Sequence, residues 1–273
     1  MRRMVGIVRV VHPAPTVAVV AVSVALGSIL SAQAGMPAFG ARTLLTALAV
    51  LGSQIVTGAA NDWADRDRDA LAQPDKPIPA GELTPHQAIG VAVAGVILLL
   101  AASLPLGPLP LALGVAATAS AVAYSLWLSG TPLSVVPYLV SFGILPVWIA
   151  AGVAVPLERI AAAPLLIAPF AAAAHLANTV RDFDADASVG RRNLSQALGR
   201  RASLVLALVL AMGVGIGAGV ALLAGGRMGV PSGALGLIGL VAVAQGAGNP
   251  RRLWGGMLVA GVCWTAAWAL ATG

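Results

Sequence analysis

The sequence predicts an all-α membrane protein, and three observations lead to that class. The 273 residues are 59% hydrophobic and only 10% charged. Their mean hydropathy is +0.91. Apolar runs of about 20 residues, the length that crosses a bilayer core of about 30 Å, recur along the chain. A soluble domain of this length would need far more polar surface to cover its exterior, so soluble classes are excluded.

Nine apolar segments predict nine membrane spans, which we expect to form a single transmembrane domain over residues 1–273. In chain order they cover Thr16–Gly35, Thr43–Ala60, Gln87–Leu106, Leu109–Leu128, Leu133–Val153, Ile160–Val180, Ser203–Leu223, Gly233–Ala247 and Leu253–Ala271. The eighth segment is short and rich in glycine. Glycine, with 32 residues in the chain, favours close packing of helices in lipid.

The positions of the basic residues predict the orientation in the membrane. The N-terminal segment and the loops after the second, sixth and eighth spans contain thirteen of the sixteen Lys and Arg residues. Cytoplasmic loops carry such an excess, so we expect the N-terminus and these loops in the cytoplasm. Every acidic residue except Glu158 lies on the same side. Because the basic residues follow this rule, the net charge of +6 does not indicate a nucleic-acid partner, and none is expected.

The first apolar segment resembles a cleavable signal peptide, because Arg2 and Arg3 precede it and "SAQA" ends it. Cleavage would leave eight spans and place most basic residues outside the cell. That arrangement inverts the usual charge distribution, so we expect the first span to be retained.

Two triplets of one Asn and two Asp, each spaced four residues apart, follow the second and sixth spans. They are Asn61, Asp65 and Asp69, and, 117 residues later, Asn178, Asp182 and Asp186. On a helix this spacing aligns the side chains along one face. Aligned like charges repel, so we expect a bound cation, and carboxylate and amide oxygens suit Mg²⁺. The alternative, solvated loop residues, would have to reproduce the same spacings twice by chance. Asp67 and Asp184 are expected to face elsewhere.

Basic residues follow both triplets and predict an anionic ligand. Lys76 follows the first, and Arg191 and Arg192 follow the second. Guanidinium groups bind phosphate oxygens in pairs, whereas lysine acts as a point charge. The expected metal ion and these basic side chains together predict that the site binds a diphosphate. For the two arginines, anchoring at the membrane surface is an equal alternative.

The quoted residues also resemble a known family, the UbiA-type intramembrane prenyltransferases. "NDWADRDRD" resembles the family's first motif, NDxxDxxxD, with Asn61, Asp62, Asp65 and Asp69 in the motif positions. "KPIPAG" is similar to the segment that follows it. "DFDAD" resembles the second motif, DxxxD, and "GRRNLSQALG" resembles its sequel. The resemblance spans most of the chain.

The resemblance implies a bundle of nine helices around a central cavity, with both Asp motifs at its cytoplasmic mouth. It implies an enzyme that uses Mg²⁺ to transfer an isoprenyl group from a prenyl diphosphate to an aromatic or other hydrophobic acceptor within the lipid bilayer. A terpene cyclase on the same scaffold, with no external acceptor, is the alternative. A transporter would require charges near mid-membrane, whereas every carboxylate here ends a span.

The site residues expected from motif and spacing fall into three groups. The catalytic group is Asp62, Asp65, Asp69, Asp182 and Asp186. The metal ligands are the two triplets. The substrate-binding group is Asn61, Lys76, Asn178, Arg191, Arg192, Tyr124 and His175.

One departure from the family pattern keeps the cyclase open. The family commonly has a basic residue shortly after a tyrosine between the fourth and fifth spans. Here "YSLWLSGTPLS" has Tyr124, but Leu128 and Ser129 stand where the charge is expected.

Histidine and aromatic residues supply further candidates. His175 shares the helical face of the second triplet. We expect it either to orient the acceptor or remove its proton, or to be a hydrogen-bonded structural residue. Tyr138 and Phe142, with Trp148 as a less certain helper, could stabilise a carbocation through their ring faces. The alternative is that they pack against other helices, which is the commoner role of aromatic residues on helices. His12 is expected in the membrane interface.

Overall fold

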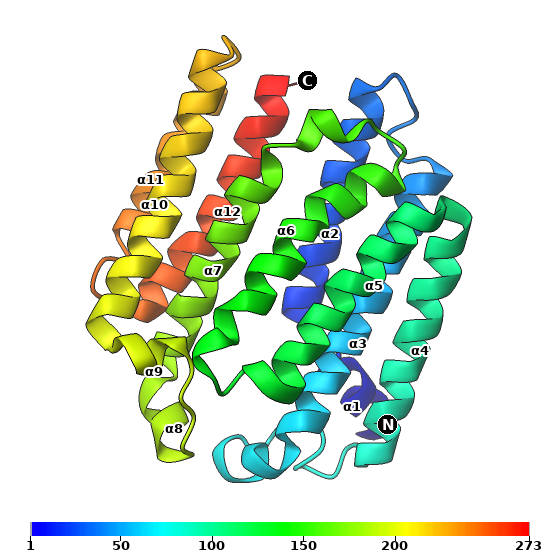
Figure 1. The fold of residues 1–273 in the computed structure, drawn as a ribbon, viewed down its shortest axis with the longest axis vertical. Coiled ribbons are helices and arrows are strands. Elements are labelled where there is room, and N and C mark those ends of the chain that lie inside the picture. Colours follow the sequence, from blue (N-terminus) through cyan, green and yellow to red (C-terminus); the bar gives the residue numbers. More distant parts are fainter. Residues whose placement is uncertain (1, 273) are drawn as a thin grey trace. The chain divides into compact units, whose positions relative to one another are not determined.

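A computed structural model describes residues 2–272, and all regular structure in that range is helical (Figure 1). The α-helices are α1 (Arg2–Val10), α2 (Pro13–Gln33), α3 (Ala41–Ala72), α4 (Pro85–Ser103), α5 (Pro108–Ala123), α6 (Val136–Gly152), α7 (Ala163–Arg181), α8 (Phe183–Ser188), α9 (Leu194–Leu198), α10 (Arg200–Ala224), α11 (Val230–Ala244) and α12 (Pro250–Thr272). The predicted all-α membrane class is confirmed.

Eight helical segments within residues 2–272 are long and apolar enough to cross a membrane. They are Pro13–Gln33, Ala41–Ala72, Pro85–Leu106, Pro108–Leu128, Pro132–Gly152, Leu157–Arg181, Arg200–Ala224 and Pro250–Ala271. The remaining predicted span corresponds to α11, an apolar helix of 15 residues that is shorter than a full crossing requires. The count of nine spans therefore stays a prediction.

The helix α3 runs well beyond the apolar segment that predicted it. The sequence predicts a span that ends at Ala60, yet α3 continues to Ala72. No glycine or proline interrupts residues 59–73, and acidic and basic side chains three apart support one another on a helix. The extra three turns carry the first acidic triplet out of the apolar segment on a rigid element.

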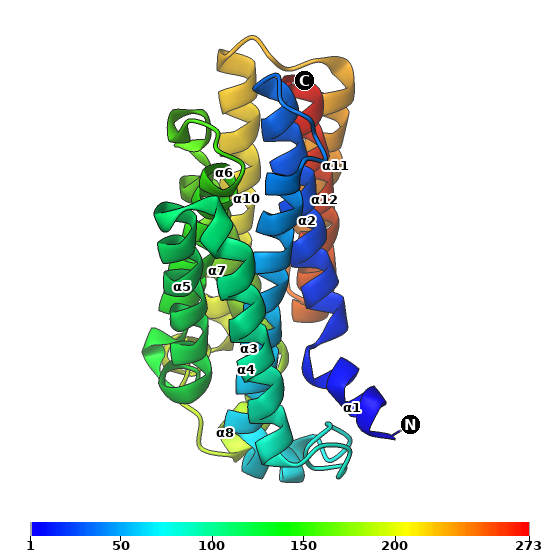
Figure 2. The same ribbon diagram turned by 90° about the vertical axis from the view of Figure 1, so that its right-hand side faces the viewer.

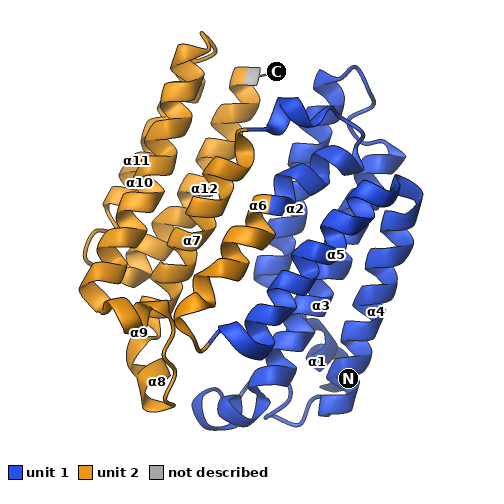
Figure 3. Ribbon diagram, in the orientation of Figure 1, with its two compact units in different colours: residues 1–129, 144–161 blue, residues 130–143, 162–273 orange. Residues whose placement is uncertain are grey.

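The chain divides into two compact units, residues 1–129 with 144–161 and residues 130–143 with 162–273 (Figure 3). The first unit contains α1 to α5 and the second half of α6. Its helices α3 and α4 lie side by side in both views (Figures 1 and 2). Gly52 and Gly95 permit this approach, because a Cβ on Gly52 would lie 2.5 Å from the backbone nitrogen of Leu99.

The core of the first unit contains Trp148, which the sequence offered as a carbocation-stabilising residue. The side chain is 1% exposed and packs among Val50, Leu99 and Ala117. A Cβ on Gly114 would lie 2.6 Å from its ring. Trp148 is therefore a packing residue, because apolar side chains from α3, α4 and α5 cover its ring.

The second unit packs its helices around another tryptophan, Trp264 of α12. Gly215 of α10 and Gly239 of α11 both face this ring so closely that an added Cβ would overlap it. The indole Nε1 donates a hydrogen bond to the carbonyl of Gly236 at 3.1 Å. Phe170 of α7 meets the ring edge to face at 5.5 Å. Four helices thus meet at one side chain.

We predict that Gly215→Ala destabilises the protein and that Gly213→Ala, two residues away on the same helix, does not. A methyl group at Gly215 overlaps the Trp264 ring, whereas one at Gly213 meets no atom within 4 Å. Overpacking of this kind costs about 1–3 kcal/mol. Thermal unfolding of both variants in detergent tests this expectation, and equal midpoints would contradict the packing role of Gly215.

Candidate functional site

The first acidic cluster lies on the last turns of α3. Asp62, Asp65 and Asp69 are three and four residues apart, so they share one helical face, and their exposed fractions are only 2%, 8% and 0%. Asn61 lies beside this face, where its Nδ2 donates to Oδ2 of Asp65 at 3.4 Å. The structure thus groups all four motif residues, with Asp62 rather than Asn61 in the buried row.

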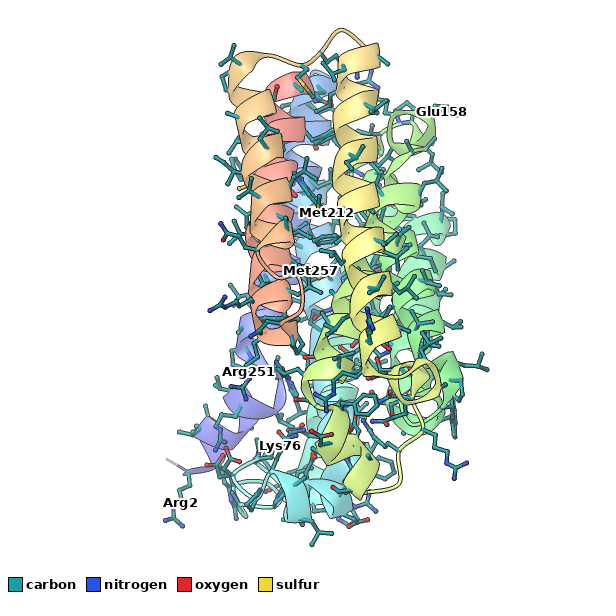
Figure 4. The ribbon with its side chains drawn as sticks, turned by 90° about the vertical axis from the view of Figure 1, so that its left-hand side faces the viewer. Arg2, Lys76, Glu158, Met212, Arg251 and Met257 are labelled. Carbon is teal, nitrogen blue, oxygen red and sulfur yellow. The ribbon has the colours of Figure 1, made fainter. Side chains whose placement is uncertain are left out.

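Two basic side chains compensate the charge of this cluster. The ammonium of Lys76 lies 2.8 Å from Oδ2 of Asp69 and 3.2 Å from Oδ1 of Asp62. Arg68 forms an ion pair with Asp65. Buried carboxylates are costly unless they are paired, so these two cations make the burial possible. Lys76 lies at the opposite end of the first unit from Glu158 (Figure 4).

The environment of Lys76 keeps it charged. Burial by itself lowers the pKa of Lys76, but the hydrogen bond to Asp69 and the negative charges of Asp62 and Asp69 outweigh burial and raise the pKa above its ordinary value of 10.5. Lys76 is therefore a fixed positive charge in the cluster.

The loop between α3 and α4 positions Lys76. The carbonyl of Gln73 accepts a hydrogen bond from the Lys76 amide at 3.0 Å, and the Lys76 carbonyl accepts one from the Ala80 amide at 2.9 Å. Gly81 has a φ of 70°, which favours glycine. Thr84 then starts α4 with a capping box. "KPIPAG" is thus a compact turn that holds the ammonium against α3.

The donor atoms of the first cluster fit a hard metal ion. Oδ2 of Asp62 and Oδ1 of Asp69 are buried and accept no hydrogen bond. Within residues 2–272, no three His, Cys, Asp or Glu side chains converge around a point as a metal cage. The ammonium of Lys76 instead lies between the two aspartates. By their chemistry, carboxylate oxygens suit Mg²⁺, which commonly completes its shell with water and phosphate.

The second acidic cluster does not lie on one continuous helix, but the Asp182 amide donates to the Asn178 carbonyl at 3.3 Å and the Asp186 amide to the Asp182 carbonyl at 2.9 Å. The single stripe of side chains therefore stays a prediction there. The helix α7 ends at Arg181 and α8 begins at Phe183, with Asp182 between them at φ −97° and ψ 14°. Arg181 pairs with Asp182 through two hydrogen bonds of 3.0 and 2.9 Å. Consecutive residues of a regular helix do not face each other, so this pair accompanies the break. Asn178 stays on α7 and is half-buried.

Asp186 is held by the segment that follows it. Nδ2 of Asn193 donates to Oδ2 of Asp186 at 2.8 Å, and Nη1 of Arg191 lies 3.7 Å from Oδ1. The amide of Arg192 donates to the carbonyl of Gly130 at 3.1 Å. "GRRN" therefore folds back beside both Asp186 and the loop in which the sequence lacks a basic residue.

Two aspartates outside the triplets are solvated. The side chains of Asp67 and Asp184 are 88% and 87% exposed and pair with Arg66 and Arg200. The prediction that they face away from the triplets is confirmed.

His175 lies in an aromatic and polar cluster of the second unit. Its Nε2 lies 3.0 Å from the hydroxyl of Ser134, which also accepts a hydrogen bond from the Leu194 amide. Its ring lies 4.4 Å from that of Tyr138, whose ring stacks with Phe142 at 6.1 Å. These contacts agree with a hydrogen-bonded structural histidine, and its role toward a substrate stays a prediction.

Tyr124 begins a π-helical turn that ends at Leu128, where the Ser129 amide donates to the Tyr124 carbonyl at 2.8 Å. Such turns widen a helix locally and are frequent at functional sites.

His12 is a site residue that sequence reasoning missed, as is Asn193, which holds Asp186. Nε2 of His12 lies 2.9 Å from Oδ1 of Asp62, so His12 belongs to the first cluster rather than only to the membrane interface. No helical spacing could have revealed this contact, because 50 residues separate the two. The one sequence signal is His-Pro at the start of a predicted span.

Comparison with known proteins adds a family and a fold. The model of the UbiA prenyltransferase family matches residues 20–252. A digeranylgeranylglyceryl phosphate synthase of Natronomonas pharaonis is 33% identical over 166 residues, which are 59% of this chain and 60% of that protein. The bacteriochlorophyll synthase 33 kDa chain of Cereibacter sphaeroides is 38% identical over 79 residues, which are 28% of this chain and 26% of that protein. This chain thus spans at most 60% of these two relatives.

Solved structures share the fold at low identity. A structure described for digeranylgeranylglyceryl phosphate synthase in membranes has a TM-score of 0.75 at 16% identity, covering 100% of this chain and 99% of that one. A UbiA homologue from Archaeoglobus fulgidus, bound to GPP and Mg²⁺, has a TM-score of 0.65 at 16% identity, covering 98% and 100%.

We predict that Lys76→Met lowers the free energy of unfolding by about 3 kcal/mol, because removal of one partner leaves buried carboxylates uncompensated. Arg201→Met, at an exposed position, should change it by less than about 0.5 kcal/mol. Chemical unfolding in detergent with a chelator at neutral pH measures both values. Equal small effects would contradict the role of Lys76 as the counter-ion.

Proposed function

Because the chain belongs to the UbiA prenyltransferase family, we propose that it transfers an isoprenyl group from a prenyl diphosphate to a hydrophobic or aromatic acceptor within the membrane, with Mg²⁺ as cofactor. The observation that carries the proposal is the first acidic cluster. Of three buried carboxylates, those of Asp62 and Asp69 contact the ammonium of Lys76 and that of Asp65 pairs with Arg68, and two of their oxygens accept no hydrogen bond. Such a cluster can take up further positive charge.

The proposed Mg²⁺ ligands are the side-chain oxygens of the two triplets. They are those of Asn61, Asp65, Asp69, Asn178, Asp182 and Asp186. When bound, the metal supplies Lewis-acid chemistry that neutralises the charge of the departing diphosphate. The Archaeoglobus homologue, bound to GPP and Mg²⁺, supports this choice of donor and cofactor.

The chain's own cations are proposed to bind the diphosphate. Lys76 supplies a fixed point charge beside the first triplet. The guanidinium of Arg191 lies 3.7 Å from Oδ1 of Asp186, and we propose that Arg192, the next residue, supplies a second one; the forked geometry of both groups matches phosphate oxygens. Their placement next to Gly130 supports the proposal that they provide the charge missing from the loop after Tyr124.

The proposed reaction breaks the bond between the allylic carbon and the diphosphate oxygen, and the electron pair leaves with the diphosphate. The acceptor then bonds to that carbon and gives up a proton. His175 is proposed to orient the acceptor or receive the proton, and Tyr124 to contact substrate. Exclusion of water protects the electron-poor carbon from hydrolysis, which suits the burial of the first cluster.

The proposal extends to the setting of the enzyme. Residues 1–273 are proposed to act as a single prenyltransferase domain, with the N-terminus and both acidic clusters on the cytoplasmic side. The excess of Lys and Arg in the N-terminal segment and in the loops that carry the clusters supports this orientation.

We predict that Asp65→Asn and Asp182→Asn each reduce Mg²⁺-dependent diphosphate release at least about 100-fold, because each removes a negative metal ligand. Asp67→Asn and Asp184→Asn are the matched controls, since both carboxylates are exposed in the same segments. Both controls should retain release within about threefold of the unaltered protein. Purified protein would be assayed with prenyl diphosphates of several lengths, with and without a panel of aromatic and lipid acceptors.

The acceptor panel separates the proposal from its alternative. Release that requires an acceptor supports the transferase and identifies the acceptor class. Release without any acceptor, together with a cyclic product, would favour the terpene cyclase. No release with any donor would contradict both.

A further inference from the structure

The N-terminal segment reaches the first acidic cluster through His12. This residue separates α1 from α2, and its backbone has φ 55° and ψ 71°, a left-handed conformation that is uncommon outside glycine. The bend turns the imidazole toward α3, where Nε2 lies 2.9 Å from Oδ1 of Asp62. Figure 2 shows α1 as a separate short helix at this bend.

Close packing fixes the segment in this position. Val10 is fully buried and packs with Ala59 of α3 and Leu83 of the following loop. A Cβ on Gly58 would lie 2.8 Å from the carbonyl oxygen of Val10, so only glycine leaves room for this backbone. The segment therefore contacts both α3 and the loop that carries Lys76.

An ion pair ties the same segment to that loop. Nη1 of Arg9 donates to Oε1 of Glu82 at 2.7 Å, and Nη2 donates to the carbonyl of Asp75, next to Lys76. Gly6 packs against Glu82, where an added Cβ would lie 2.9 Å from the Glu82 Cβ. The position of His12 is thus set from two sides.

The chemistry of the contact assigns the direction of the hydrogen bond. A carboxylate only accepts hydrogen bonds, so Nε2 of His12 must carry the proton. Oδ1 of Asp62 then receives both His12 at 2.9 Å and the ammonium of Lys76 at 3.2 Å. Two donors on one oxygen fix the rotation of the carboxylate and direct Oδ2 into the buried interior, where it accepts no hydrogen bond.

We propose that His12 is a positioning residue: by holding Asp62, it fixes Lys76 and shapes the first acidic cluster for its ligand. The kinetic consequence rests on the proposed function, whereas the structural consequence for Lys76 does not. Supporting groups of this kind commonly change ligand affinity or activity by about 10- to 100-fold when they are removed.

The sequence offers a direct probe, because Lys76 is its only lysine. The rate at which an amine-reactive ester labels Lys76, followed by peptide mass spectrometry without metal or substrate, reports how firmly the ammonium is held. His12→Leu should raise this rate about 10-fold. His12→Gln, whose amide can donate from a similar distance, should stay within about threefold of the unaltered protein. His86→Leu, at an exposed position of α4, is the matched control.

Steady-state kinetics provide the second measurement. His12→Leu should raise KM for the prenyl diphosphate about 10-fold, whereas KM of His12→Gln should stay close to that of the unaltered protein. In the Asp62→Asn background, His12→Leu should add little, because both changes break the same link. Thermal midpoints of all variants separate loss of positioning from loss of folding.

The outcomes decide the proposal. An unchanged labelling rate of Lys76 in His12→Leu would overturn it. So would equal labelling rates and KM values in His12→Leu and His12→Gln, if the thermal midpoints of both variants are unchanged. Additive effects of His12→Leu and Asp62→Asn would also overturn it. If labelling rises as expected but no form of the protein releases diphosphate, the positioning role stands and the proposed reaction fails.

Discussion

The burial of three carboxylates at the end of α3 is the constraint on which the rest of the first unit depends. Asp62, Asp65 and Asp69 are almost fully covered, and buried anions of this kind are unstable unless cations and donors meet them. Lys76 forms ion pairs with Asp62 and Asp69, and Arg68 forms one with Asp65. These hydrogen-bonding and charged partners are positioned by three elements: the long α3, the compact "KPIPAG" turn and the anchored N-terminal segment.

The two acidic clusters are alike in sequence and different in structure. The first lies on one continuous helix, and its carboxylates pair with the ammonium of Lys76. The second spans a break between α7 and α8, which leaves Asp182 45% exposed while Asn193 holds Asp186.

Much of the fold and part of the site follow from local pattern. Apolar runs predicted the membrane helices, because only a helix satisfies its own backbone in lipid. The spacing of four placed Asp65 and Asp69 on one helical face, and this held because α3 is regular. The same spacing crosses a helix break at Asp182, whose side chain pairs with its neighbour Arg181. Whether Trp148 packs in the core or faces a cavity did not follow from the sequence, because helical position does not reveal which neighbours cover a ring.

The sequence by itself determined the membrane class, the family motifs and the residues that carry charge, since all of these depend on residue type and short spacing. Only the tertiary structure decided that His12 meets Asp62 and that Lys76 lies between Asp62 and Asp69. The contact of His12 joins residues 50 positions apart through a left-handed bend and a glycine-lined seat on α3. Such contacts arise from the packing of whole elements, and that packing is a property of the folded chain rather than of any local stretch.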